Sequence, residues 1–361
     1  MDCTQTDWLS NKEYLEHFRK KVAQQRVPLS GSLDLTHRCN LRCVHCYLGD
    51  QKGIRQHSKA ELSAAQWMSI MDDLRDAGCL HLLITGGDPL LRRDFEKIYR
   101  HAKSNGFLVT VFTNGTTVTE SILELFEDLP PRAVEISLYG ATAATYERVT
   151  GIRGSYAQCL KGIQGLLDRQ VNLSLKTILM TLNRHEFYDM EHMAKEYGVK
   201  FRFDAAIFPS FNNDKGPIRL RVTPEEVIEK EFSDTDRSQK WKDYFDRTKG
   251  FAVSETLYNC GAGVTMFHVD AYGNLQPCLM AIGYKYNLLG GDFLTGWHDV
   301  MPLMRRKKAG AAYACNQCEK RTLCGFCPAF SRLENNAEDV YSKYLCAIGH
   351  LRFQAVQHTC M

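Results

Sequence analysis

Residues 37–47 read HRCNLRCVHCY, which places Cys39, Cys43 and Cys46 in one short segment with the spacing C-x3-C-x2-C. Three thiolates in one loop can bind three irons of a [4Fe-4S] cluster and leave the fourth iron open to a reacting ligand, whereas a caged electron-transfer cluster takes four cysteines. The alternative is a structural zinc site, which also favours closely spaced Cys and His but closes with four ligands.

The bulk composition narrows the class of protein. The chain has 361 residues and a formal net charge of +3, which suits one large domain with a smaller one and gives no argument for a nucleic-acid or membrane partner. The polar start has no apolar signal segment, and no run of about 18 apolar residues appears. We therefore expect a cytoplasmic protein. In a reducing cytosol, its 14 cysteines are better explained as metal or cluster ligands than as disulfides.

Short apolar runs alternate with amphipathic stretches between residues 32 and 206, which predicts repeated βα units and a parallel sheet. Six units are too few for a full eight-stranded barrel. A helix over 11–25 is expected before them. The predicted strands are 32–36, 81–85, 108–113, 133–138, 172–178 and 200–204, and the predicted helices are 64–77, 94–104, 119–127, 157–169 and 186–197.

The cysteine triplet, with His45 and Tyr47 beside its last member, resembles the signature of the radical S-adenosylmethionine (radical SAM) enzymes. The resemblance implies an α/β fold, a partial (β/α)6 barrel, in which S-adenosylmethionine (SAM) binds the open iron. The cysteine loop follows the first strand. It therefore opens on the face where the strands end, which is where barrels generally have their active sites.

Residues 85–90 read TGGDPL and resemble the family's Gly-Gly-Glu-Pro turn, whose backbone and acid meet the amino group of SAM. The resemblance assigns this role to Gly86, Gly87, Asp88 and Pro89, with Asp88 keeping the carboxylate. Glycines let a backbone approach a ligand closely. The alternative is an ordinary turn between a strand and a helix.

Weaker matches follow further along the barrel. Asn114, which ends the third strand, is a further candidate SAM contact, and the resemblance assigns the ribose and carboxylate of SAM to Ser137 and Arg148. A strand-end hydroxyl and a surface ion pair are the alternatives for these two. Asp204, at the predicted end of the sixth strand, is the candidate substrate-facing acid, with a structural ion pair as its alternative.

A second cysteine group resembles the SPASM extension of radical SAM enzymes, which binds two auxiliary iron–sulfur clusters. The match is complete except that two residues, and not three, separate the last closely spaced pair. A zinc ribbon is the alternative. The family scheme assigns one auxiliary cluster to Cys315, Cys318, Cys324 and Cys346, and the other to Cys260, Cys278 and Cys327.

Seven thiolates leave one of eight iron positions without a cysteine. Some relatives supply an eighth cysteine, which is expected here at Met266. The corresponding iron is then open, or it takes another ligand such as His268, Asp270, Cys360 or water. The expected cofactors are therefore SAM and three [4Fe-4S] clusters.

The resemblance implies cleavage of SAM to a 5′-deoxyadenosyl radical that takes hydrogen from a substrate carbon. The first reading is oxidative modification or crosslinking of a ribosomally made peptide. The alternatives are oxidation or trimming of a small molecule or tetrapyrrole, and sulfatase maturation. Leu279 counts against sulfatase maturation, because those relatives carry an Asp that acts as a base directly after the corresponding cysteine.

The expected partners are the peptide and a flavodoxin- or ferredoxin-like reductant. About thirty residues precede the barrel and no peptide-recognition domain is expected among them, so a separate carrier protein or the barrel itself would recognise the peptide. The expected organisation is an N-terminal helical segment (1–30), the barrel (31–210), a bridge (211–254) and the auxiliary-cluster domain (255–361).

Overall fold

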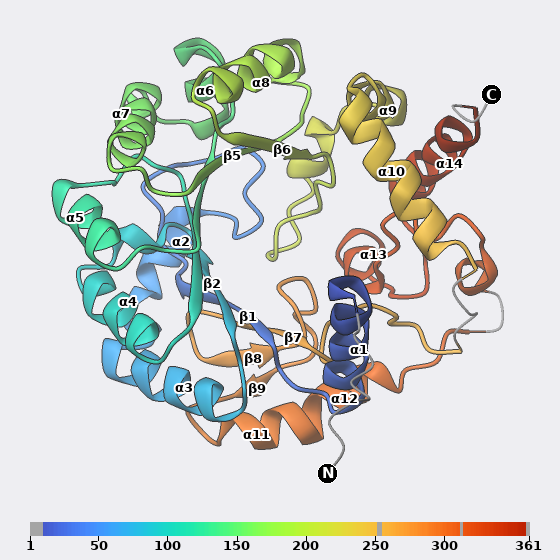
Figure 1. The fold of residues 1–361 in the computed structure, drawn as a ribbon, viewed down its shortest axis with the longest axis horizontal. Helices are drawn as coiled ribbons and strands as arrows, with labels where there is room; N and C mark the ends of the chain where they lie inside the picture. Colours follow the sequence, from blue (N-terminus) through green and yellow to red (C-terminus); the bar gives the residue numbers. More distant parts are fainter. Residues whose placement is uncertain (1–9, 251–254, 311–312, 359–361) are drawn as a thin grey trace, which may run out of the picture.

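The computed structural model describes residues 10–250, 255–310 and 313–358. Its strands form one curved sheet in the order β6-β5-β4-β3-β2-β1-β7-β8-β9 (Figure 1). Neighbouring strands from β6 to β1 are parallel, β7 pairs in parallel with β1, and β8 and β9 continue as antiparallel strands. The strands are β1 Ser30–Thr36, β2 His81–Gly86, β3 Leu108–Thr113, β4 Ala133–Ser137, β5 Leu173–Ile178, β6 Lys200–Asp204, β7 Met266–Val269, β8 Asn274–Gln276 and β9 Tyr286–Asn287.

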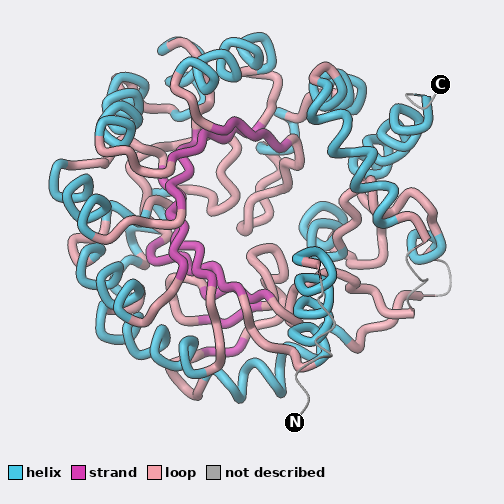
Figure 2. Tube along the Cα trace, in the orientation of Figure 1, coloured by secondary structure: helices cyan, strands magenta, loops and turns pink. Residues whose placement is uncertain are grey.

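Helices cover the outer face of this curved sheet and, with the C-terminal elements, complete a ring around a central space (Figure 2). The barrel helices are α2 Gln51–Gln56, α3 Ala64–Asp76, α4 Phe95–Ser104, α5 Glu120–Asp128, α6 Ala143–Thr150, α7 Ser155–Asp168 and α8 Phe187–Glu196. The remaining helices are α1 Asn11–Gln24, α9 Pro224–Phe232, α10 Thr235–Thr248, α11 Phe293–Thr295, α12 Met301–Arg305, α13 Pro328–Asn335 and α14 Lys343–His358. No helix in the described ranges is both long and apolar enough to cross a membrane.

The predicted α/β fold, built on six βα units, is confirmed, and each predicted strand begins and ends within two residues of the observed one. The sequence did not predict β7, β8 and β9, which are only four, three and two residues long and carry too few positions for a periodic signal. They extend the sheet from its β1 edge, so the C-terminal part of the chain continues the barrel wall. The bridge contains α9 and α10, and α9 begins with a capping box at Thr223.

Alternation along the strands decides which side chains line the central space. Leu33 and Leu35 of β1 are fully buried in the main hydrophobic core, together with Trp67 of α3 and Val269 of β7. Because successive side chains of a strand point to opposite faces, the residues between these leucines point inward. The inner face is polar on several strands, and it is the wall on which the candidate site is built.

Candidate functional site

The segment that carries Cys39, Cys43 and Cys46 runs from the end of β1 to α2. Gln51, the first residue of α2, holds its start: the side-chain oxygen accepts from the backbone N–H of Cys39 at 2.7 Å, and the amide nitrogen donates to the carbonyl of His37 at 3.2 Å. Two backbone N–H groups of the segment then donate hydrogen bonds of 2.8 and 3.0 Å to carbonyl oxygens at the end of α6. The chain thus fixes the three cysteines in an irregular loop.

The three thiols of this loop lie close together and are not joined in a disulfide. Burial raises the pKa of Cys43, and the neighbouring Cys46 and Cys39 thiols add to that rise. Donors point at Cys39 Sγ from Leu41 N at 3.4 Å and Asn114 Nδ2 at 3.7 Å. N–H groups directed at a sulfur suit a ligating thiolate, whose negative charge they stabilise. Among the described residues, no three His, Cys, Asp or Glu side chains converge on a point that would hold a single metal ion.

The two glycines of the β2 turn make room for the cysteine segment. A Cβ on Gly86 would lie 2.1 Å from the carbonyl oxygen of Thr36, and one on Gly87 would lie 2.3 Å from that of Arg38. Gly87 N donates to Thr36 O at 2.8 Å. The space that these glycines leave is therefore taken up by the protein's own backbone just before Cys39.

Asp88 is fully buried in the same turn. Its carboxylate accepts hydrogen bonds from the Thr113 hydroxyl and the Asn114 backbone, both at 2.8 Å, and from Leu90 N at 3.0 Å. Burial raises the pKa of Asp88, and these hydrogen bonds oppose the rise. Both oxygens are thus engaged within the protein, so a contact with the amino group of SAM would have to replace one of these bonds. Pro89 begins a short 3-10 turn directly after Asp88.

The other predicted SAM contacts lie on the strands and helices that follow. Asn114, at the end of β3, donates to Asn40 Oδ1 at 2.9 Å as well as to Cys39 Sγ. Ser137 is half-buried as the last residue of β4, and Arg148 is exposed on α6. The end of α6 is the part of the molecule on which the cysteine segment docks.

Asp204 ends β6 and is exposed, and its side chain accepts from Ala206 N at 2.7 Å. A second acid, Asp34 of β1, escaped the sequence analysis. It is fully buried on the inner face, and neither of its oxygens has a hydrogen-bond partner among the described residues. His37 Nε2 lies 3.3 Å and His268 Nε2 lies 3.7 Å from Asp34 Oδ2. No signal in the sequence marks Asp34, because its neighbour His268 lies on β7, far along the chain, and only the pairing of β1 with β7 brings the two together.

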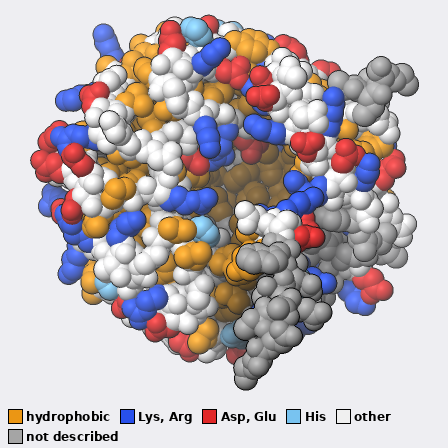
Figure 3. Space-filling view, viewed as in Figure 1, with side chains coloured by type: hydrophobic (Ala, Val, Ile, Leu, Met, Phe, Trp, Pro, Cys, Tyr) orange, Lys and Arg blue, Asp and Glu red, His pale blue; other side chains and the backbone are white. Residues whose placement is uncertain are grey.

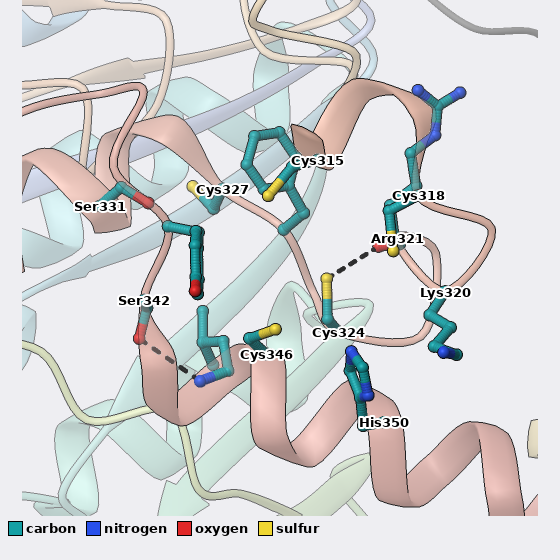
Figure 4. A pocket seen from close by; sticks show the side chains of 13 residues that line it. Cys315, Cys318, Lys320, Arg321, Cys324, Cys327, Ser331, Ser342, Cys346 and His350 are labelled. Carbon is teal, nitrogen blue, oxygen red and sulfur yellow. Dashed lines mark hydrogen bonds between the residues drawn. The ribbon is translucent and has the colours of Figure 1, made fainter. Parts of the chain in front are cut away.

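The C-terminal cysteines fall into two groups. Figure 4 shows Cys315, Cys318, Cys324 and Cys346 around one pocket, which Cys327 also lines. Burial raises the pKa of Cys324 to about 12, and the thiols that add to this rise are those of Cys315, Cys318 and Cys346.

Cys327 belongs with the other group. Burial raises its pKa to about 12 as well, and there the contributing thiols are those of Cys278 and Cys260. Across the two groups, the thiols therefore gather in the same two sets that the resemblance implies.

The residues considered for the eighth iron position have different surroundings. Met266 is exposed, and its sulfur lies beside Gly261, the residue after Cys260. His268 is buried with its Nδ1 2.8 Å from the Ser32 hydroxyl, and Asp270 accepts hydrogen bonds from its own turn. Cys360, like Cys3, lies outside the described residues.

The chain is similar to a known protein family and to characterised bacterial and archaeal proteins. A family model described as the radical SAM superfamily matches residues 33–196. The chain is 27% identical to the antilisterial bacteriocin subtilosin biosynthesis protein AlbA of Bacillus subtilis, over 89% of this chain and 71% of that protein. It is 23% identical to the AdoMet-dependent heme synthase of Methanosarcina barkeri, over 85% of this chain and 93% of that protein.

Among solved structures, Streptococcus suis SuiB bound to precursor peptide SuiA matches with a TM-score of 0.70 and 17% identity, over 96% of this chain and 83% of that one. A similarity at this level of identity shows that the two chains share a fold.

Proposed function

Because residues 33–196 form a radical SAM domain, we propose that this enzyme uses SAM and a [4Fe-4S] cluster on Cys39, Cys43 and Cys46 to modify a ribosomally made peptide oxidatively. The observation that carries the proposal is the three-thiol loop, which the β2 turn and α6 hold at the strand ends with N–H donors directed at its sulfur. When bound, SAM and the cluster supply a 5′-deoxyadenosyl radical able to take hydrogen from an unactivated carbon.

The chain's own residues position these groups. In the proposal, the backbone of Gly86, Gly87 and Pro89 borders the methionine end of SAM, while Asp88 fixes that turn to Asn114. Ser137 and Arg148 are the proposed contacts for the ribose and the carboxylate of SAM. A planar guanidinium suits a carboxylate because it donates two parallel hydrogen bonds.

We propose two auxiliary clusters, one on Cys315, Cys318, Cys324 and Cys346 and one on Cys260, Cys278 and Cys327. Their role is to take up the electron that the substrate loses as two hydrogens are removed in total. In support, the thiols that raise the pKa of Cys324 and those that raise the pKa of Cys327 belong to the two proposed sets.

The set with three cysteines leaves one iron for a non-cysteine ligand or a substrate atom. Met266 is one candidate position, since its side chain lies beside the residue that follows Cys260. Iron-57 Mössbauer spectra of the reconstituted protein, compared with those of a Met266→Cys variant, test this point. A wild-type spectrum with no distinct iron site, unchanged in the variant, would mean four protein ligands and would end the open-site proposal.

Support for a peptide substrate comes from the relatives: one is named for subtilosin bacteriocin biosynthesis, and one structural neighbour was solved with a precursor peptide. The second candidate function is trimming or oxidation of a small molecule of the tetrapyrrole type, which the heme synthase relative supports. Sulfatase maturation is disfavoured, because this chain has Leu279 where sulfatase-maturing relatives have an Asp that acts as a base. A flavodoxin- or ferredoxin-like reductant and a separate peptide carrier are proposed partners.

The testing experiment is an intact-mass comparison under anaerobic, reducing conditions. Reconstituted enzyme and SAM are incubated with short peptides encoded beside its gene, and 5′-deoxyadenosine is measured in parallel. Loss of two hydrogens in step with deoxyadenosine establishes a peptide maturase. Deoxyadenosine without a peptide mass change rejects the peptide proposal and directs the assay to tetrapyrrole substrates.

Two variants serve as matched controls. Cys43→Ala removes a proposed ligand of the SAM-binding cluster, so neither deoxyadenosine nor product should form. Cys324→Ala removes a proposed auxiliary ligand and should lose product while keeping some deoxyadenosine. If Cys43→Ala still cleaves SAM at the wild-type rate, the assignment of that cluster is wrong.

A further inference from the structure

The inner wall of the barrel carries a charged ledge that no part of the SAM site uses. Its members are Glu135 of β4, Lys176 of β5 and Arg202 of β6, on three neighbouring strands. Strand register places Lys176 beside Arg202 on one side and beside Ser137 on the other. The residues that flank Lys176 in β5, Leu175 and Thr177, are buried on the outer face, so Lys176 points inward.

The two cations of the ledge share one carboxylate. Arg202 donates from Nε to Glu135 Oε2 at 2.9 Å, whereas Lys176 Nζ remains 3.9 Å from the same oxygen. Lys176 also lies over the ring of Phe112, on β3. When Lys176 is protonated, two positive charges face one negative charge on the ledge.

Among the described residues, the Lys176 ammonium makes no hydrogen bond to a protein atom, although only 18% of its side chain is exposed. An ammonium has three donors, and leaving them unpaired in a half-buried site is unfavourable. Burial lowers the pKa of Lys176 well below its usual range, with Arg202 acting in the same direction and Glu135 opposing it. In the described part of the chain, the partners of Lys176 are Glu135 Oε2 at 3.9 Å and the ring of Phe112, so its N–H donors remain free for an acceptor that arrives with a ligand.

The position of the ledge indicates which ligand reaches it. Figure 3 shows that the molecule is hollowed at the centre of the ring of elements, with hydrophobic side chains in its depth and Lys and Arg around its margin. Arg202 is more than half exposed, and although its Nε and Nη2 donate to Glu135, its Nη1 has no hydrogen-bond partner among the described residues and can meet an entering group. A planar guanidinium beside an ammonium is suited to a carboxylate.

We propose that Lys176 and Arg202 bind a carboxylate group of the substrate and thereby orient the substrate inside the barrel. This inference rests on the proposed peptide-modifying function. The carboxylate is then that of an acidic side chain or of the peptide's C-terminus. The carboxylate of SAM is the other source of the same chemistry, and the experiment separates the two.

The test compares wild type with Lys176→Met, which keeps the length of the side chain and removes its charge. Lys161→Met, on the exposed outer surface of α7, is the matched control. Three quantities are measured on reconstituted protein: the thermal midpoint, the affinity for SAM with deoxyadenosine formation in the absence of peptide, and kcat/KM for the converted peptide.

The expected result for Lys176→Met is an unchanged or slightly higher thermal midpoint and SAM affinity within about twofold of wild type. The expected loss in kcat/KM is about 10- to 100-fold, the usual range for a hydrogen-bonded charge pair. When the peptide's carboxyl groups are amidated, kcat/KM of the wild type should fall by the same factor, whereas kcat/KM of Lys176→Met should not fall further. Lys161→Met should behave as wild type.

Three results overturn the proposal. If Lys176→Met lowers the SAM affinity tenfold or more, the ledge binds SAM. If it lowers the thermal midpoint by several degrees, Lys176 has a structural role. If amidation of the peptide affects both proteins equally, Lys176 does not bind a peptide carboxylate. If wild type converts no peptide, the proposed function fails by itself. The thermal midpoint and the SAM affinity still show whether Lys176 is structural or binds SAM. The substrate comparison is then made with a tetrapyrrole that carries a free carboxylate and with its ester, in place of the peptide.

Discussion

The side-chain oxygen of Gln51 accepts a hydrogen bond of 2.7 Å from the backbone N–H of Cys39. The same amide donates to the carbonyl of His37, so one buried side chain holds the start of the cysteine loop from both directions. The loop has no regular secondary structure of its own here, so its shape depends on such contacts.

Gln51→Leu keeps the volume of this side chain and removes both hydrogen bonds. The variant leaves a buried N–H and a buried carbonyl without partners, which we expect to cost about 2–4 kcal/mol of local stability. Iron and sulfide per protein after reconstitution should fall, and deoxyadenosine formation with them. Gln56→Leu, at an exposed position of the same helix, is the control. Full cluster loading in Gln51→Leu would show that the loop needs no support from α2.

Gly87→Ala addresses the contact between the β2 turn and the cysteine segment. The added Cβ would meet the Arg38 carbonyl at 2.3 Å, and backbone must then move because no flexible side chain can give way. We expect a loss of at least about 2 kcal/mol in the free energy of unfolding and poor loading of the SAM-binding cluster.

The matched control for that substitution is Gly53→Ala in α2. A Cβ there meets nothing closer than 3.9 Å, and alanine favours a helix, so the unfolding free energy should stay equal or rise by up to about 1 kcal/mol. Similar midpoints for Gly87→Ala and Gly53→Ala in chemical denaturation would contradict the close approach of the two segments.

Much of the barrel could be predicted from the sequence, because its strands and helices are long enough to show their periodicities. The cysteine sets, which the family resemblance implied, stay a prediction. That the glycines of the turn approach a ligand stays a prediction; the structure adds that a Cβ at Gly86 would meet Thr36, which lies fifty residues earlier. Sequence alone gives no measure of such an approach.

The inner wall could not be predicted for a related reason. Lys176, Glu135 and Arg202 are unremarkable charges within their own strands, and only the pairing of β4, β5 and β6 brings them together. Asp34 and His268 likewise meet because the short strand β7 pairs with β1. Functional residues that depend on non-local pairing remain hidden until the register is known.

Glu186 gives a prediction with a defined pH dependence. Its carboxylate accepts from the Thr142 hydroxyl at 2.6 Å and from the backbone of Ala141 at 2.7 Å, and so holds the loop that follows Ser137. Burial acts to raise the pKa of Glu186, but hydrogen bonds from Thr142, Thr145 and the Ala141 backbone outweigh it, so the pKa of Glu186 is lowered from its usual value.

A lowered carboxyl pKa stabilises the fold above the unfolded-state value and ceases to do so as the pH falls through the folded-state value. Glu186→Gln should therefore cost about 1–3 kcal/mol at pH 7, because the amide cannot accept all of these bonds. As the pH falls through the lowered folded-state pKa of Glu186, the two proteins should converge. Urea unfolding at pH 7 and at acidic pH checks this, and a gap that widens as the pH falls would refute the assigned sign. Glu196→Gln, exposed at the end of α8, controls for a general charge effect.

Arg352 of α14 joins the bridging helices to the proposed auxiliary-cluster loop. Its guanidinium binds Glu231 of α9 through two hydrogen bonds of 2.7 and 2.6 Å and donates to the carbonyl of Leu323 at 2.7 Å, one residue before Cys324. The guanidinium also lies 4.2 Å from the ring centre of Trp241 on α10. Arg352→Lys keeps the charge but loses the planar fork and the stacking, so we expect a loss of about 1–3 kcal/mol.

The consequence should be confined to the C-terminal clusters, since Arg352 makes none of these contacts with the barrel strands. Iron content should fall toward that of one cluster, while deoxyadenosine formation without substrate persists. Arg247→Lys, exposed on α10, is the control. If Arg352→Lys loses all iron together, the three sites load as one cooperative unit and the separation between barrel and auxiliary region is wrong. If it loses none, the Leu323 contact does not support the loop.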